Sequence, residues 1–464
     1  MNRDIVWVTL ESVRRDRTSE GASERRTTPN LARLASREDA VGFGNAVAHS
    51  IWTRPSTASI LTGRAPSDHR VWSAEAALPD GMRTVPEQLR DAGYRTVGVS
   101  ANPQFSPATG LDRGFERFHY LERGSLVREA GFGTMCRYLL NVRRHSAGLT
   151  TDTRQHCLGF LHDSIARRHI GRAADDDRPL FLYVHLGDSH HPYCPPKGFR
   201  DRFADELALS PADALETVLD ASARLHEHIA EGVPFDEERW NALSVLYDTC
   251  LAYVDALAGS IVDAASSRLD DPVIVVTADH GEFFGEDDLL AHMLSTHTAV
   301  TDVPLVVRGL DERAAANGPV QHADVWATLS GRSIPAVDVP IGRDLVSESP
   351  SFAVTQRGGE RAAKKVETIA AHNPSFDGDR YGRGPVTSLR TESHRLRRDA
   401  DGDALFDLRD ETTDIRETEP ALAAELSDAA DEWLRERGQP SAGHDGEATF
   451  SSEMERRLED LGYL

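Results

Sequence analysis

The chain has 464 residues and a formal net charge of −23, from 75 acidic and 52 basic residues, and 39% of its residues are hydrophobic. This composition is typical of a folded globular protein and unlike that of a disordered one. The acidic balance argues against a nucleic-acid partner, whose phosphates such a surface repels. No run of 18 apolar residues and no signal-peptide pattern occurs, so we expect a cytoplasmic protein without a membrane partner.

Nearly all the basic residues are arginine, and the four cysteines lack any metal-binding spacing. Many carboxylates with few lysines suit a halophilic protein in concentrated salt, where charge repulsion is screened. A genome that prefers arginine codons explains the same bias. The cysteines are expected to be reduced thiols.

Along the chain, short apolar runs rich in β-branched and aromatic residues predict buried strands at Ile5–Leu10, Thr96–Ser100, Leu180–Leu186 and Val273–Ala278. Amphipathic patterns between them predict helices at Asn30–Ala35, Val85–Ala92 and about Trp240–Ser267. This alternation predicts an α/β fold with a mostly parallel central sheet sandwiched by helices.

The segment pattern also predicts how the chain is divided. A catalytic α/β domain is expected at 1–355, with an acidic helical insertion or lid at 199–240. A smaller C-terminal α+β subdomain is expected at 356–440. Its antiparallel strands are predicted at Val386–Arg397 and Ala404–Leu408, on either side of an Asp401-Gly402 turn, with a helix at about Ala421–Arg437. Residues 441–464 are predicted to form a linker and a terminal helix.

Polar residues follow each of the four predicted strands. They are Glu11, Asn102, the run from Asp188 to His191, and the pair Asp279-His280. Ligands of such sheets bind beyond the carboxyl ends of the strands, so we expect these side chains to share one site. Carboxylate and imidazole groups are good ligands for a divalent ion.

The hydroxyl group of Thr53 has two interpretations. It lies in the segment Trp52-Thr-Arg-Pro-Ser-Thr-Ala-Ser-Ile-Leu-Thr-Gly63. Pro55 suits a first helical turn and Gly63 a helix end, which places Thr53 beside a helix N-terminus. There it could attack an anionic ester, because helix N-termini favour anions. Alternatively, Thr53 is simply an N-cap. Together with Glu11, Asp279 and His280 it would complete a site for one divalent ion (Ca, Mg, Mn or Zn).

Several motifs occur in an order that resembles sulfatase-type members of the alkaline phosphatase superfamily. They are Thr9-Leu-Glu11-Ser-Val-Arg14-Arg-Asp16, Thr28-Pro-Asn, Thr53 to Gly63, Asp188-Ser-His190-His-Pro-Tyr193, Asp279-His280-Gly-Glu282, and Leu405-Phe-Asp-Leu. The resemblance implies the superfamily fold, a metal-dependent hydrolase of sulfate or phosphate esters, and Thr53 as the nucleophile. It further implies that Arg54 contacts the substrate oxyanion and that His190 or His292 protonates the leaving oxygen. A second ion held by Asp188, His190 and His292 is a further option.

The sequence departs from the sulfatase pattern at three places. Glu11 stands where Asp is usual, Thr57 replaces an arginine, and Thr53 replaces the cysteine that sulfatases oxidise to formylglycine. Threonine cannot undergo that oxidation, so the resemblance points to phosphoesterase relatives that attack with threonine directly.

Small-molecule or saccharide sulfate or phosphate esters are the expected substrates. Three other functions stay open: a phosphodiesterase, a phospho- or sulfotransferase of the same superfamily, and an inactive sulfatase-like binding protein, which the substitutions at Glu11 and Thr57 favour.

Overall fold

The central element of the fold is a seven-stranded sheet. The structure is a computed structural model, and it describes residues 2–21, 23–148, 150, 152–310, 314, 318–382, 384–438 and 446–461. The strand order is β2-β9-β6-β1-β5-β3-β4. The strands are β1 (Ile5–Leu10), β2 (Ala40–Val47), β3 (Arg95–Ser100), β4 (Arg117–Tyr120), β5 (Leu180–Leu186), β6 (Val273–Ala278) and β9 (Asp302–Arg308). Only β9 runs antiparallel to its neighbours, so the predicted α/β fold with a mostly parallel sheet is confirmed.

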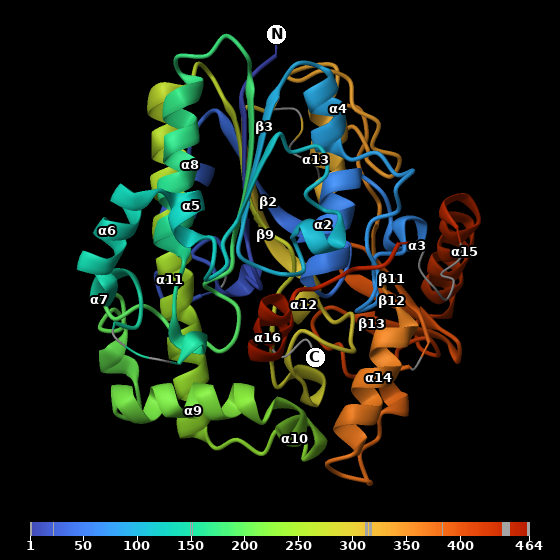
Figure 1. Ribbon diagram of the computed structural model, residues 1–464. Helices are drawn as coiled ribbons and strands as arrows, with labels where there is room; N and C mark the ends of the chain where they lie inside the picture. Colours follow the sequence, from blue (N-terminus) through green and yellow to red (C-terminus); the bar gives the residue numbers. More distant parts are fainter. Residues whose placement is uncertain are drawn as a thin grey trace.

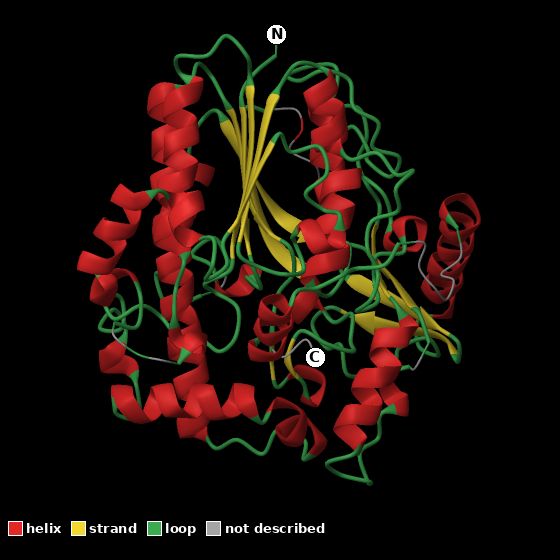
Figure 2. Cartoon of the chain, viewed as in Figure 1, coloured by secondary structure: helices red, strands yellow, loops and turns green. Residues whose placement is uncertain are grey.

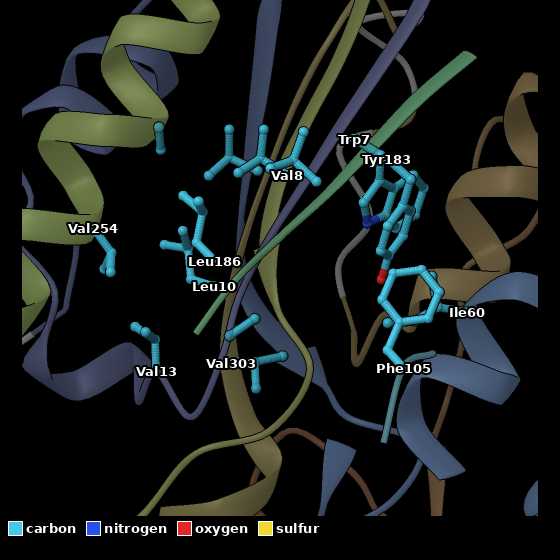
Figure 3. Close-up of a cluster of buried hydrophobic side chains, with 14 of the residues drawn as sticks. Trp7, Val8, Leu10, Val13, Ile60, Phe105, Tyr183, Leu186, Val254 and Val303 are labelled. Carbon is cyan, nitrogen blue, oxygen red and sulfur yellow. The ribbon is translucent and has the colours of Figure 1, made fainter. Parts of the chain in front are cut away.

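The three middle strands are buried along their whole length. Every residue of β1, β5 and β6 is buried, because helices cover both faces of the sheet. Figure 3 shows Trp7, Tyr183 and Phe105 together on one side of the sheet, and Val8, Leu10 and Leu186 on the other. Continuous apolar runs on both faces explain why these strands match the sequence prediction closely.

Helices form a layer on each face of the central sheet (Figure 1). One layer contains α1 (Pro29–Ala35), α8 (Gly159–Ala173) and α11 (Glu237–Arg268), and the other contains α2 (Thr53–Thr62), α4 (Val85–Asp91) and α13 (His322–Leu329). Trp326 of α13 stacks on Trp7 of β1, with ring centroids 4.6 Å apart. Shorter elements connect these parts: α3 (Pro66–His69), α5 (Leu126–Ala130), α6 (Phe132–Leu140), α7 (Val142–His145), β7 (Phe283–Phe284), β8 (Leu290–Ala291) and α12 (Thr298–Thr301).

Helix α11 is long and apolar enough to span a membrane by length and composition, alone among the helices that the structure describes. The most apolar window of this helix is 89% buried inside the protein. It is therefore a core helix, which packs against α1, α8 and β1.

The insertion predicted at 199–240 is helical, with α9 (Pro211–Ala223) and α10 (Leu225–Ala230). Ser210 caps α9 by accepting a hydrogen bond from the Asp213 amide. Helix α10 packs against α14 of the C-terminal part, so the insertion joins the two parts of the molecule.

A second, four-stranded antiparallel sheet lies in the C-terminal part of the chain (Figure 2). Its strands are β10 (Ala353–Arg357), β11 (Val386–Arg390), β12 (His394–Asp399) and β13 (Gly402–Asp407), accompanied by α14 (Gly359–Ala370) and α15 (Pro420–Arg437). Two predictions need correction. The segment Val386–Arg397 is two strands, because the chain turns between Arg390 and His394, and the boundary at 355 falls inside β10.

The terminal helix α16 (Ser452–Asp460) returns to the catalytic part of the chain. Leu458 is buried in the main hydrophobic core, and Glu453 accepts a hydrogen bond from the amide of Arg123. Figure 1 shows α16 below the end of the central sheet, near the start of α2. Most of the linker predicted before it, residues 439–445, lies outside the described residues.

Candidate active site

The carboxyl ends of the middle strands bring two carboxylates and an imidazole together. Leu10 is paired with Ala278 on one side and with Leu186 on the other, so Glu11 and Asp279 leave adjacent strands at the same level. His185 of β5 lies between their side chains. Its Nε2 is 3.3 Å from Asp279 Oδ2, and its Nδ1 is 3.9 Å from Glu11 Oε2. All three are fully or almost fully buried.

Thr53 is the first residue of α2, and its hydroxyl faces this pair of carboxylates. The N-cap is Trp52, so the alternative that Thr53 serves only as the cap is wrong. The Thr53 hydroxyl donates to Glu11 Oε1 at 3.0 Å and lies 3.3 Å from His280 Nε2. At the other end of α2, Gly63 has a left-handed φ of 62°, and a Cβ there would come within 2.5 Å of Val339.

The charges of the two carboxylates are set by burial and by their neighbours. Burial raises the pKa of Glu11 to about 7, although His185 counteracts this shift. Glu11 Oε1 also accepts a hydrogen bond from the Asn102 amide. Burial acts in the same direction on Asp279, but His280 and His185 outweigh it, so the pKa of Asp279 is lowered. Two buried carboxylates next to each other favour a bound cation.

Beside the carboxylates lies a cluster of four histidines: His190, His191, His280 and His292. The ring centroids of His280 and His292 are 4.4 Å apart, and those of His190 and His292 are 4.9 Å apart. Each of three rings has a partner at Nδ1. His280 Nδ1 lies 2.9 Å from the Gly281 carbonyl, and His190 Nδ1 lies 2.7 Å from the His191 carbonyl. His292 Nδ1 lies 2.9 Å from Glu282 Oε1. Such partners fix the tautomer that carries a lone pair on Nε2, as in metal-binding histidines.

The second ion set predicted from Asp188, His190 and His292 needs correction. The side chains whose ligand atoms lie within 4.8 Å of one another are His190, His191 and His292. Asp188 instead accepts a hydrogen bond from the amide of Leu158, 2.9 Å away, and burial raises its pKa to about 6. The structure therefore places His191, whose Nδ1 is 3.1 Å from the Ser222 hydroxyl, where the prediction placed Asp188.

Arg54 has partners other than those predicted. Its guanidinium is fully buried and donates to the Gln104 side chain at 2.6 Å and to the carbonyls of Ser73, Ala74 and Ala76. These hydrogen bonds tie the start of α2 to the following loop. Through Nε and Nη1, Arg54 thus helps to position the start of α2, where Thr53 lies, and its contact with the substrate oxyanion stays a prediction.

Three cations that the sequence interpretation missed come from the C-terminal part. Arg361 of α14 lies over the Trp52 ring, 4.3 Å from its centroid, and its charge lowers the pKa of His280 and His292, for which burial is the main cause. Arg457 of α16 lines the same pocket as Glu11, Asn102, Asp188 and His190. Lys365 of α14 is 6% exposed, with its ammonium 3.5 Å from His226 Nε2.

The site as a whole combines side chains that could hold a metal ion with nearby positive charge. Glu11, Thr53, Asp279 and His280 offer oxygen and nitrogen donors in a buried space, as the sequence predicted for them. The N-terminus of α2 and the cations Arg361 and Arg457 supply positive charge near these donors. Together, the parallel sheet, the hydroxyl at a helix start and the buried carboxylates define an enzyme of the alkaline phosphatase-like sulfatase superfamily.

Comparison with known proteins assigns the family. The family model described as Sulfatase matches residues 3–332, and the chain belongs to that family. It is 24% identical over 323 residues to the uncharacterized sulfatase YidJ of Escherichia coli, covering 65% of this chain and 62% of that protein. It is also 26% identical over 352 residues to a choline-sulfatase of Rhizobium meliloti, covering 70% of this chain and 67% of that protein.

Solved structures support the same fold. A phosphonate monoester hydrolase of Agrobacterium radiobacter superposes with a TM-score of 0.68 at 18% identity, covering 97% of this chain and all of that one. A 2-O GAG sulfatase superposes with a TM-score of 0.65 at 15% identity, covering 94% and 93% of the two chains. The α/β architecture is therefore shared by enzymes named for phosphorus esters and by enzymes named for sulfur esters.

Proposed function

We propose that the protein is a metal-dependent hydrolase of phosphate or sulfate esters that uses Thr53 as its nucleophile and prefers phosphorus. The observation that carries this proposal is the position of the Thr53 hydroxyl, 3.0 Å from Glu11 Oε1 and 3.3 Å from His280 Nε2 at the first residue of α2. A hydroxyl group in that position lies next to both the ligands of a cation and the amide groups of a helix start.

The residues of the site fit one divalent ion. Glu11 and Asp279 are buried, with the His185 ring nitrogens 3.9 Å from Glu11 Oε2 and 3.3 Å from Asp279 Oδ2. With His280 and the Thr53 oxygen, they form a mixed oxygen and nitrogen donor set of the kind that such ions accept. When bound, the ion would lower the pKa of the nucleophile and neutralise negative charge on the ester.

The protein's own side chains account for the other requirements of ester cleavage. The amides at the start of α2, with Arg361 and Arg457, hold the anionic ester so that its central atom faces the Thr53 oxygen. Thr53 attacks as its hydroxyl proton passes to Glu11 Oε1, which accepts its hydrogen bond at 3.0 Å. His190 or His292 gives a proton to the leaving oxygen as the ester bond breaks. Burial lowers the pKa of both histidines. Either imidazole would therefore carry the proton that it donates only once the anionic substrate is bound. Water then cleaves the covalent threonine ester.

The preference for phosphorus follows from the chemistry of Thr53. A covalent sulfate on a threonine is slow to resolve by attack of water, whereas formylglycine expels sulfate by collapsing to an aldehyde. Threonine has no such route, since its Cβ carries no second hydroxyl group that could collapse to a carbonyl. A phosphoryl intermediate can be cleaved by water with the same electrostatic assistance as in its formation.

The test is the measurement of metal content in pure protein, followed by turnover of chromogenic phosphate monoesters, phosphate diesters and sulfate esters at equal metal and salt. We expect phosphorus esters to be cleaved faster, and Thr53→Ala to lower kcat by about 1,000-fold or more. Thr53→Ser, which keeps the hydroxyl, should retain part of the activity. Near-normal turnover by Thr53→Ala would contradict the role of the nucleophile, and faster cleavage of a sulfate ester would contradict the preference.

A further inference from the structure

The exposed large hydrophobic side chains of the described residues all lie in one short stretch. They are Val127, Phe132, Leu139 and Leu140, with exposed fractions of 56%, 76%, 60% and 85%. Val127 is on α5, and the other three are on α6. Exposed apolar groups are common singly, but a concentration of this kind marks a binding surface.

Helix α6 has two apolar faces, and the protein covers only one of them. Met135 and Tyr138 are buried on the side of α8, where the Tyr138 hydroxyl donates to the carbonyl of Cys157 at 2.9 Å. Phe132, Leu139 and Leu140 are seven and eight residues apart, which places them two turns apart on another face. Figure 1 shows α6 and α7 at the outer edge of the molecule, away from the central sheet. This second face therefore points outward.

The charge of this stretch is opposite to that of the whole chain. No acidic residue occurs from 130 to 151, although the chain has 75 acidic residues among 464. Arg137, Arg143 and Arg144 are exposed, and none of the ion pairs among the described residues includes them. Elsewhere most exposed arginines of the described residues face a carboxylate, as Arg33 faces Asp263 and Arg83 faces Asp91. The apolar face is thus bordered by arginines that lack a protein anion.

We propose that α5, α6 and α7 form a docking patch for the surface of an anionic lipid membrane. Phenylalanine and leucine side chains enter the region between headgroups and acyl chains, while arginines bind lipid phosphates. Charge complementarity selects this partner. In a symmetric pair of protein copies the same face would meet itself and set arginine against arginine, so a second copy fits less well. Surface docking of this kind needs no membrane-spanning helix.

The test measures how much of the purified full-length protein sediments with lipid vesicles. One set of vesicles contains phosphatidylcholine alone, and the other contains one third phosphatidylglycerol. We expect at least about tenfold stronger binding to the anionic vesicles at low salt, decreasing as salt is raised. Two patch variants are compared with the wild type: Phe132→Ser with Leu139→Ser and Leu140→Ser, and Arg137→Glu with Arg143→Glu and Arg144→Glu.

A matched variant separates local from overall charge. Arg26→Glu, Arg409→Glu and Arg435→Glu together change the net charge by the same amount at exposed positions on other elements. This control should bind as the wild type does, and each patch variant should lose about tenfold or more of its affinity while cleaving a soluble chromogenic ester normally. No vesicle binding by the wild type, or equal losses in control and patch variants, would overturn the proposal. The proposal would also be overturned if light scattering showed that the wild type is a dimer and the patch variants are monomers, while the wild type binds no vesicles.

Discussion

The two sides of the candidate active site are built in different ways. Glu11, Asp279 and Thr53 meet because they stand directly after neighbouring strands or at a helix start, and the order of a parallel sheet fixes their positions. Arg361 and Arg457 reach the same place from α14 and α16, which come from the far end of the chain and join the main core through Val366 and Leu458. In the proposed function, the first side would supply the chemistry and the second would supply positive charge for the substrate. Changes on the first side should therefore act on kcat, and changes on the second side on KM.

The largest effect apart from that of Thr53 is expected at Asp279. Asp279→Asn removes one buried carboxylate of the proposed ligand set, together with the negative partner of His185 and His280. We expect the bound metal to be lost and kcat to decrease by about 100-fold or more, with unchanged circular dichroism. Full metal content with normal turnover in this variant would show that the carboxylate is not a ligand.

A smaller effect, on substrate binding, is expected from Arg361. Arg361→Gln removes the guanidinium over Trp52 and should raise KM by about tenfold, with kcat changed less than about threefold. Arg361→Lys should recover part of the loss. Lys364→Gln, on the exposed side of the same helix, is the matched control and should change neither constant. A decrease in kcat without a change in KM would place Arg361 on the chemical side of the comparison.

Arg457 is expected to have the weakest effect on the kinetics, since its charge acts from the wall of the pocket. Arg457→Gln should raise KM about three- to fivefold, and the loss should shrink as salt is raised. The adjacent Arg456 is exposed, so Arg456→Gln is a control with the same chemistry on the same helix. If both variants behave alike, α16 contributes through its fold and not through the charge of Arg457.

A stability measurement tests the same region without substrate. Burial lowers the pKa of Lys365 to about 7. Below pH 7 the folded protein must hold a buried charge, and this penalty is relieved as the pH rises from 7 towards 10.5, because the unfolded chain then binds more protons. Lys365→Met should therefore increase the free energy of unfolding at pH 6 by roughly 3–5 kcal/mol and by much less at pH 9. Urea denaturation at both values checks this, with Lys364→Met as the control. If Lys365→Met changed the free energy of unfolding equally at pH 6 and pH 9, the lowered pKa of Lys365 would be contradicted.

The difference between the two sides also explains what could be predicted from the sequence. Continuous apolar runs indicated the four predicted strands, and the polar residues after two of them led to Glu11, Asp279 and His280. Strand β2 was missed because Gly42, Gly44 and Asn45 interrupt its pattern, and β9 because Pro304 does. The interior position of His185 in β5 hid it within an apolar run.

The residues of the C-terminal side gave no local signal. Arg361 and Arg457 are two arginines among many, and only the packing of α14 and α16 against distant parts of the chain places them at the site. Arg54 shows the converse. Its position next to Thr53 indicated a substrate contact, which stays a prediction, whereas the structure shows its Nη1 donating to the carbonyls of Ser73, Ala74 and Ala76. Neighbourhood in sequence predicts position but not the direction of a long side chain.

The central claim is that Thr53 forms a covalent bond with the substrate. The direct measurement is a rapid acid quench of the enzyme during turnover of a phosphate ester, followed by mass spectrometry of its peptides. We predict one phosphoryl group on the peptide that contains Thr53, located on that residue by fragmentation and absent from Thr53→Ala. Complete turnover with Thr53 unmodified at every quench time, or the phosphoryl group on His190 or His292 instead, would contradict the account.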